Sequence, residues 1–234
     1  MSLSPLILTV PGLENSGPHH WQTLWEARLP HCSRVELGMW EQPHRNTWVN
    51  NLNLTILSAS APVVLAAHSL GCMAVAWWAA LAPDAAARIK GALLVAPPEV
   101  ENAPCDERLR AFAPVPRKTL PFPTIVVGSH DDPYLSLEGA RTLARDWGAR
   151  FADAGRVGHI NARSGLGDWP FGQFLLRQLI AMTACQPSAS CPMLIASPDC
   201  QLPTTINENG DRPSLLPDAS ADISADSRLR QNTT

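Results

Sequence analysis

Residues 62–71 read PVVLAAHSLG, and this stretch decides the fold. Residues 62–67 are apolar without polar alternation, as is typical of a strand that is buried on both faces of a parallel sheet. The alanine-rich residues 72–81 that follow predict a helix, which ends before Pro83. A buried strand that turns directly into a helix is the building unit of α/β proteins.

The rest of the first 185 residues repeats this alternation. Further strands are predicted over 6–10, 34–37, 91–96, 124–128 and 149–152, and further helices over 18–29, 46–58, 137–147 and 168–182. The proline-rich residues 99–122 predict a loop with a short helix. Because crossovers between parallel strands are right-handed, the carboxyl ends of all strands are expected at one edge of the sheet. The sequence therefore predicts an α/β fold, doubly wound, with a parallel sheet.

The end of the chain differs in composition from the rest. All eight tryptophans lie at or before Trp169, and residues 187–234 contain no aromatic residue. That segment is rich in Pro, Ser, Asp and Asn, so it cannot bury enough apolar surface to offset the entropy of ordering. We expect one domain over residues 1–185 and a disordered tail over residues 186–234.

Charge and hydropathy exclude two classes of partner. The net charge is −3 and the basic residues are scattered, so no basic stripe for nucleic acid is present. Residues 62–82 are the nearest approach to a membrane span, and His68, Ser69 and Gly71 interrupt them. The first ten residues have no basic region and no cleavage site for secretion. We therefore expect a cytoplasmic protein that binds neither membrane nor nucleic acid.

Metal and cofactor sites are not indicated. The six cysteines form no CxxC pair, so we expect reduced thiols and no zinc site; they are Cys32, Cys72, Cys105, Cys185, Cys191 and Cys200. His19 and His20 are adjacent and would diverge on a helix, which favours a surface role over metal binding.

Three residue types used in nucleophilic catalysis follow predicted strands. Ser69 follows the strand at 62–67, Asp131 and Asp132 follow the strand at 124–128, and His159 follows the weaker strand at 149–152. Ser, then Asp, then His is the chain order of the triad in α/β-hydrolases. These side chains are therefore expected to meet at one edge of the sheet.

Ser69 has the most specific surroundings. Residues 67–71, AHSLG, match the G-x-S-x-G nucleophile elbow with Ala67 in place of the first glycine. The turn would expose the hydroxyl and direct the Leu70 N–H at a developing oxyanion, with Leu13 after the first strand as the expected second donor. The alternative interpretation is an ordinary serine cap of the following helix.

His159 is the candidate general base, since an imidazole accepts and returns a proton near neutral pH. A surface loop histidine is the alternative interpretation, and His68 and His130 are weaker candidates for the base. Asp131 and Asp132 compete as the acid that would orient the imidazole. Asp132 is favoured because Pro133 biases it toward an extended conformation, and Asp131 is the alternative.

The chain resembles a known family in five motifs. PG near the N-terminus, HHWQTLWEARLP, AHSLGC, GSHDDPYLS and GHIN are similar to the small serine hydrolases named after retinoblastoma-binding protein 9. The likeness covers about residues 5–182 and departs from the superfamily pattern at Ala67. The resemblance implies a small α/β-hydrolase without a large lid, with Ser69 as nucleophile, Asp132 as acid and His159 as base. An L-x-C-x-E pocket-binding motif is missing, because Ala74 follows Met73.

A carboxylester hydrolase is the function that the resemblance implies. Residues 97–122 are too few for a large lid, so we expect an open site that takes small or short-acyl esters as substrates. Trp21, Trp25 and Trp40 could line this site, although core packing is the commoner role for such residues. A catalytically silent binding protein and an acyltransferase are the alternative functions, and we expect a monomer or homodimer.

Overall fold

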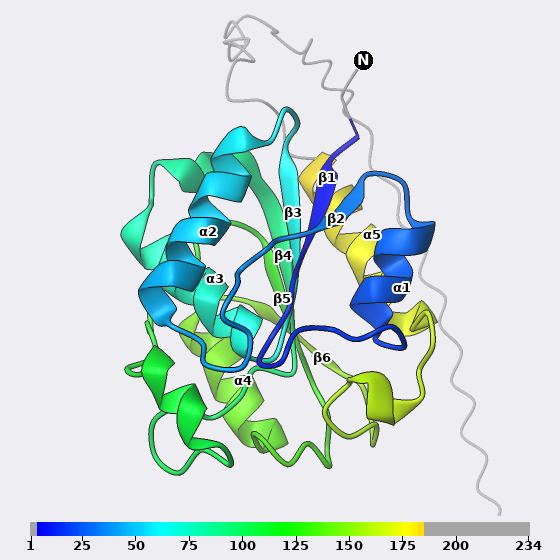
Figure 1. Ribbon diagram of the computed structural model, residues 1–234. Helices are drawn as coiled ribbons and strands as arrows, with labels where there is room; N and C mark the ends of the chain where they lie inside the picture. The colour runs from blue at the N-terminus through cyan, green and yellow to red at the C-terminus, as the bar shows by residue number, and fades with distance from the viewer. Residues whose placement is uncertain (1–3, 185–234) are drawn as a thin grey trace, which may run out of the picture. The chain divides into compact units, whose positions relative to one another are not determined.

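Six parallel strands form one sheet in the order β2-β1-β3-β4-β5-β6 (Figure 1). The computed structural model describes residues 4–184. The strands are β1 (Leu6–Val10), β2 (Cys32–Arg34), β3 (Val63–His68), β4 (Ile89–Val95), β5 (Thr124–Gly128) and β6 (Arg150–Asp153). The prediction of a parallel α/β sheet is confirmed.

Strand β3 lies in the middle of the sheet because it is apolar on both faces. Each of its six residues is buried, and it pairs with β1 on one side and β4 on the other. Leu65 is opposite Leu8 of β1, and Ala66 is opposite Leu93 of β4. The continuous apolar run at 62–67 thus has the sheet position that its composition predicts.

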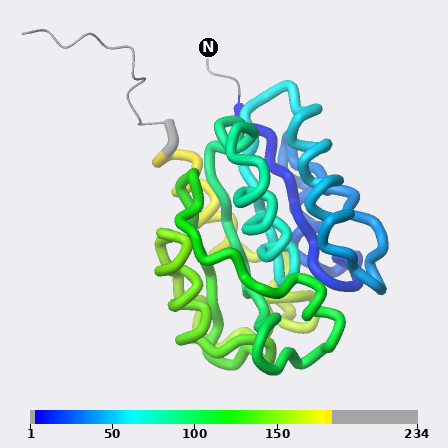
Figure 2. The backbone as a smooth tube through the Cα atoms, turned by 90° about the vertical axis from the view of Figure 1, so that its left-hand side faces the viewer, coloured from blue at the N-terminus to red at the C-terminus, as the bar shows by residue number. Residues whose placement is uncertain are grey.

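Helices cover both faces of the sheet (Figures 1 and 2). Leu65 and Ala67 pack in the core under α2, α3 and α4, whereas Val64 and Ala66 pack in the core under α1 and α5. Figure 2 looks onto the face that carries α2, α3 and α4. The helices are α1 (Trp21–Arg28), α2 (Arg45–Ser58), α3 (Leu70–Leu81), α4 (Leu137–Asp146) and α5 (Pro170–Ala184). Three short 3-10 helices complete the fold, namely η1 (Ala85–Arg88), η2 (Glu107–Phe112) and η3 (Ala162–Ser164).

All carboxyl ends of the strands lie at one edge of the sheet, the lower edge in Figure 1. The turns after β1, β3, β5 and β6 meet there. A ligand site is expected at this edge in an open α/β sheet.

Several boundaries differ from those expected. Helix α1 begins at Trp21 rather than at residue 18, because the imidazole of His20 accepts a hydrogen bond from the Gln22 N–H and caps the helix. Strand β2 ends at Arg34, and the buried Val35 and Leu37 continue as a loop that packs against other parts of the core. The predicted boundary between a domain at 1–185 and a tail at 186–234 falls outside the described residues.

Within residues 4–184, no helix is both long enough and apolar enough to cross a membrane.

Candidate active site

Ser69 occupies the sharp turn between β3 and α3. Its φ is +54° and its ψ is −127°, a backbone conformation that residues with a side chain rarely adopt. The turn fits because two glycines, Gly71 in the first turn of α3 and Gly12 after β1, lie close to it. A Cβ atom on Gly71 would lie 2.3 Å from the Val10 carbonyl oxygen, and one on Gly12 would lie 2.8 Å from the Cβ of Ser69. The close approach of the β1 and β3 ends thus requires both glycines.

His159 lies between Ser69 and Asp132. Its Nδ1 is 2.9 Å from both carboxylate oxygens of Asp132, and its Nε2 is 2.9 Å from the Ser69 Oγ. Because a carboxylate only accepts hydrogen bonds, Nδ1–H is the donor to Asp132. In neutral His159 the Nε2 is then unprotonated, so the Ser69 hydroxyl donates to it. An imidazole held in this way can accept the serine proton.

The two aspartates of the β5 loop have different surroundings. Asp132 is buried against His159 and also accepts a hydrogen bond from the Tyr134 N–H. Asp131 instead accepts hydrogen bonds from the Gly158 N–H and the Ser129 hydroxyl, and these bonds lower the pKa of its carboxyl. Asp131 therefore holds the backbone next to His159, while Asp132 contacts the imidazole itself.

Two backbone N–H groups near Ser69 are the expected donors to an oxyanion. Leu13 borders the cavity above Ser69, and Leu70 is the first residue of α3. Among residues 4–184, no hydrogen-bond acceptor is found for either N–H. An N–H at the start of a helix carries a partial positive charge that favours a negative ligand atom.

The other histidine candidates have different contacts. The His68 Nε2–H donates to the carbonyl oxygen of His159, and burial lowers the pKa of His68 well below its usual value. His130 pairs with Asp153 at the exposed end of β6. Neither side chain contacts the Ser69 hydroxyl.

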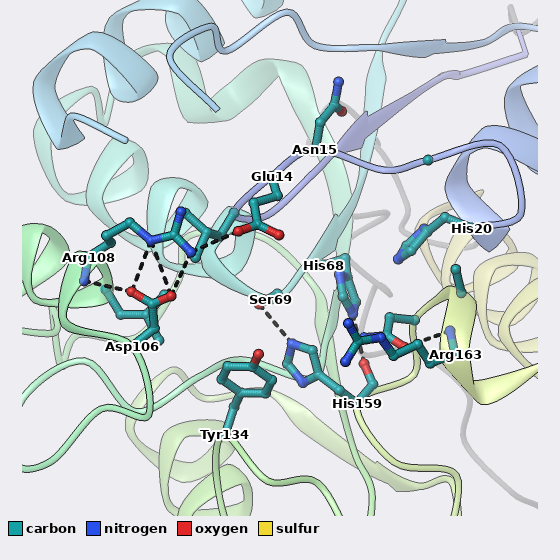
Figure 3. Close-up of a pocket in the computed structure, with 15 residues that line it drawn as sticks. Glu14, Asn15, His20, His68, Ser69, Asp106, Arg108, Tyr134, His159 and Arg163 are labelled. Atoms are coloured by element: carbon teal, nitrogen blue, oxygen red, sulfur yellow. Dashed lines mark hydrogen bonds and ion pairs between the residues drawn. The ribbon is translucent and has the colours of Figure 1, made fainter. Parts of the chain in front are cut away.

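A cavity of about 350 Å³ opens above Ser69 (Figure 3). Glu14, Asp106 and Arg108 lie on one side of it, and His20 and Arg163 lie on the opposite side. Most of the lining is polar, and the apolar lining side chains are Leu13, Leu109 and Ala162. Such a cavity offers little apolar surface to a long acyl chain.

A family model described as serine hydrolase matches residues 7–178. The chain belongs to the serine hydrolase family. Among solved structures, a protein described as a YdeN-like hydrolase from Pectobacterium atrosepticum is 31% identical, with a TM-score of 0.69 over 77% of this chain and 92% of that one. A comparison with curated protein sequences finds no match.

More distant structures share the fold of this serine hydrolase. The ydeN gene product of Bacillus subtilis is 16% identical, with a TM-score of 0.60 over 76% of this chain and 100% of that one. Est1E from Butyrivibrio proteoclasticus, with ferulic acid bound, is 15% identical, with a TM-score of 0.57 over 75% of this chain and 90% of that one.

The three tryptophans of the serine hydrolase have the commoner role, which is core packing, whereas His20 differs from its expected surface position. Trp21 and Trp25 lie in the core under α1 and α5, and neither borders the cavity. Trp40 packs against the opposite core. His20 is only 4% exposed, so the expected surface role holds for His19 alone. Its burial follows from capping α1 and from ring contact with His68, at 4.6 Å between centroids.

Sequence reasoning missed the polar lining of the cavity in this serine hydrolase. Tyr134, the only tyrosine of the chain, lies with its ring centroid 4.3 Å from that of His159. Its position directly after Asp132 and Pro133 was a signal that it would border the site. Arg108 and Arg163 lie in the short 3-10 helices η2 and η3, and no motif marks them.

No cluster of metal-ligating side chains is found in the described part of the serine hydrolase. Residues 4–184 contain no group of three or more His, Cys, Asp or Glu side chains that could hold a metal ion. Cys32, Cys72 and Cys105 are free thiols, and burial, with Glu26 adding to it, raises the pKa of Cys32 to about 12. The other three cysteines lie outside the described residues.

Proposed function

We propose that this serine hydrolase is a carboxylic ester hydrolase for small or short-acyl esters. The observation that carries the proposal is the line of hydrogen bonds from Ser69 through His159 to Asp132, with 2.9 Å at each contact. In this proposal Ser69 is the nucleophile, His159 the general base and Asp132 the acid that orients the imidazole. We also propose that this chain is related to the small serine hydrolases named after retinoblastoma-binding protein 9.

The proposed reaction begins with attack of the Ser69 Oγ on the ester carbonyl carbon. The serine proton moves to the His159 Nε2, and the carbonyl oxygen becomes an oxyanion that accepts hydrogen bonds from the Leu13 and Leu70 N–H groups. Asp132 stabilises the resulting imidazolium through Nδ1–H. The C–O bond to the alcohol then breaks, and His159 returns the proton to the leaving alcohol, which leaves an acyl-serine.

Hydrolysis of the acyl-serine repeats these steps with water. His159 removes a proton from the water as it attacks the acyl carbon, and the same proton then passes to the Ser69 Oγ as the carboxylic acid leaves. The cavity supports this step because it is open to solvent and borders His159. Its mostly polar lining supports short acyl chains as substrates.

The test combines covalent labelling with steady-state kinetics. We expect a fluorophosphonate to add to Ser69 in the intact protein, and kcat/KM for 4-nitrophenyl esters to fall as the acyl chain lengthens beyond about six carbons. Ser69→Ala should lower kcat by at least about 10⁴-fold. A folded protein that neither takes the label nor hydrolyses any ester would favour the catalytically silent alternative.

Acyl transfer is a separate outcome of the same test. If an added alcohol receives most of the acyl group in place of water, the proposal of hydrolysis is wrong while the assignment of Ser69 stands. The cytoplasmic location and the monomeric or dimeric state stay predictions from the sequence.

A further inference from the structure

The two sides of the cavity above Ser69 differ in how their charges are compensated. On one side, the Arg108 guanidinium lies 2.8 Å from a carboxylate oxygen of Glu14 and 2.7 Å from one of Asp106. The two carboxylates compensate the positive charge of the Arg108 guanidinium (Figure 3). This side of the cavity therefore offers no uncompensated cation to a substrate.

The opposite side carries His20, His68 and Arg163. Burial, together with the charge of Arg34 and with His159, lowers the pKa of His20 to about 3. Burial likewise lowers the pKa of His68. Both imidazoles are therefore neutral at neutral pH, which leaves Arg163 as the charged group of this side.

Arg163 has no ionic partner within the described residues. None of the ion pairs among residues 4–184 includes it, and no hydrogen bond of its guanidinium to another described residue is found. The residue is exposed, so a ligand can reach it. Ser69 lies between Arg108 and Arg163 in Figure 3, so an anion on a bound ester would meet a free guanidinium on one side only.

The backbone around Arg163 is fixed to the loop that carries His159. The Arg163 N–H donates to the Asn161 side chain at 2.9 Å, and the Ser164 hydroxyl donates to the Val157 carbonyl at 2.6 Å. Arg163 also borders a second cavity on the side of His159 and Tyr134. These contacts set the position of the Arg163 backbone beside the proposed reacting groups.

We propose that Arg163 binds a carboxylate of the substrate, so that the enzyme prefers short esters with a carboxylate a few bonds from the scissile ester. This inference rests on the proposed esterase function. A guanidinium presents parallel N–H donors that match the two oxygens of a carboxylate. Monoesters of short dicarboxylic acids and O-acylated short hydroxy acids are the substrate classes that fit a small, polar cavity with this charge.

Two matched substrate pairs test the charge preference. The first compares the mono-4-nitrophenyl ester of glutaric acid with 4-nitrophenyl pentanoate, and the second compares 3-acetoxypropanoate with propyl acetate. Within each pair the scissile ester is the same and a carboxylate replaces a methyl group. We expect kcat/KM to favour the anionic member of at least one pair by about tenfold, and this ratio to fall as ionic strength rises.

Arg163→Gln should bring that ratio close to one. The matched control is Arg156→Gln, which removes the same charge from an exposed residue that borders the second cavity but not the cavity above Ser69. In this control, the ratio of kcat/KM between the anionic and the neutral ester should stay within about twofold of the wild-type ratio. Circular dichroism and thermal unfolding of both variants establish that the ratio is compared between folded proteins.

Three results would overturn the inference. They are the lack of an anionic preference in both pairs, an unchanged ratio in Arg163→Gln, and an equal loss of the ratio in Arg156→Gln. If the neutral esters are still hydrolysed in these cases, the proposed esterase function stands alone. If wild-type protein hydrolyses none of the four esters, the esterase function and the carboxylate preference are both wrong.

Discussion

The side chain of His68 is hydrogen-bonded to the backbone of His159, with 2.9 Å between Nε2 and the carbonyl oxygen. His68 is the last residue of β3 and directly precedes Ser69. The residue before the proposed nucleophile therefore supports the loop that carries the proposed base. Because a carbonyl oxygen only accepts, this contact requires a proton on the His68 Nε2 and is compatible with a neutral ring.

The buried histidines predict how stability depends on pH. Burial lowers the pKa of His20 to about 3 and that of His68 below its usual value. In the unfolded chain each imidazole titrates near pH 6.5, so below that pH the unfolded state binds more protons than the folded state. The free energy of unfolding should therefore fall as pH falls from about 6.5 toward 3. Urea unfolding at pH 7, 6 and 5 measures this loss.

His20→Asn tests the contribution of one ring. Asparagine can still accept the hydrogen bond from the Gln22 N–H as a helix cap, but it does not titrate. The loss of unfolding free energy between pH 6 and pH 5 should become smaller by about 1 kcal/mol. His19→Asn, at the exposed neighbouring position, should leave the loss unchanged. Equal pH slopes in wild type and His20→Asn would contradict the argument.

The two aspartates of the β5 loop should differ in their effect on the reaction. Asp132→Asn keeps the size of the side chain but can no longer hold a proton on His159 Nδ1 in the same way, so kcat should fall by about 10³–10⁴-fold. In Asp131→Asn the amide oxygen can still accept from the Gly158 N–H and the Ser129 hydroxyl. We expect a fall of at most about tenfold there.

Steady-state hydrolysis of 4-nitrophenyl acetate compares the two variants, with thermal unfolding as the check that both are folded. A larger loss in Asp131→Asn than in Asp132→Asn would reverse the assignment of the acid.

The central strands could be predicted from the sequence because burial on both faces leaves a direct signal. β1 and β5 have the predicted bounds, 6–10 and 124–128, and β3 differs by one residue at each end. β2 was misplaced because the side chains of Val35 and Leu37 are buried in the core under α2, beyond the end of the strand at Arg34, and only the Val35 N–H still bonds to Thr9 of β1. An apolar pair in sequence does not tell these two kinds of burial apart.

Candidate site residues could be predicted where they follow a strand closely. Ser69 directly follows β3 and Asp132 lies in the loop after β5, and their chain order with His159 restricted the choice. Arg163 and Arg108 reach the cavity from 3-10 helices whose positions depend on packing with distant parts of the chain. No local pattern in the sequence contains that information.

Gly12 and Gly71 should respond differently to substitution by alanine. A Cβ on Gly71 would lie 2.3 Å and 2.5 Å from the carbonyl oxygens of Val10 and Pro11, which are backbone atoms inside the fold. Gly71→Ala should therefore lower the free energy of unfolding by about 2–3 kcal/mol. Urea unfolding measures this loss, and a change below about 0.5 kcal/mol would contradict the close packing of α3 on β1.

A Cβ on Gly12 would instead lie 2.8 Å from the Cβ of Ser69 and 3.1 Å from the Leu70 nitrogen. The loop can move outward to relieve this contact, which displaces the Leu13 N–H from the proposed oxyanion site. Loss of one such donor lowers kcat by about 10²-fold. We expect this loss in Gly12→Ala, with a smaller loss of stability than in Gly71→Ala.

The strained backbone of Ser69 predicts an unusual order of stability among its variants. The alanine side chain in Ser69→Ala would keep a Cβ at a φ of +54°, whereas Ser69→Gly removes it. Relief of such strain is worth about 1–3 kcal/mol and outweighs the greater backbone entropy that glycine loses on folding, about 0.5–1 kcal/mol. The free energy of unfolding should therefore be about 1 kcal/mol higher for Ser69→Gly than for Ser69→Ala, although both variants lack the proposed nucleophile.

Ala80→Gly is the matched control, since Ala80 is an exposed residue of α3 with ordinary helical surroundings. There the same exchange should destabilise the protein by up to about 1 kcal/mol. Opposite signs at the two positions in urea unfolding would mean that the fold holds the proposed nucleophile in a conformation that costs stability. If glycine is the less stable variant at both positions, the turn at Ser69 stores no strain, and the close approach of Gly12 and Gly71 alone explains its geometry.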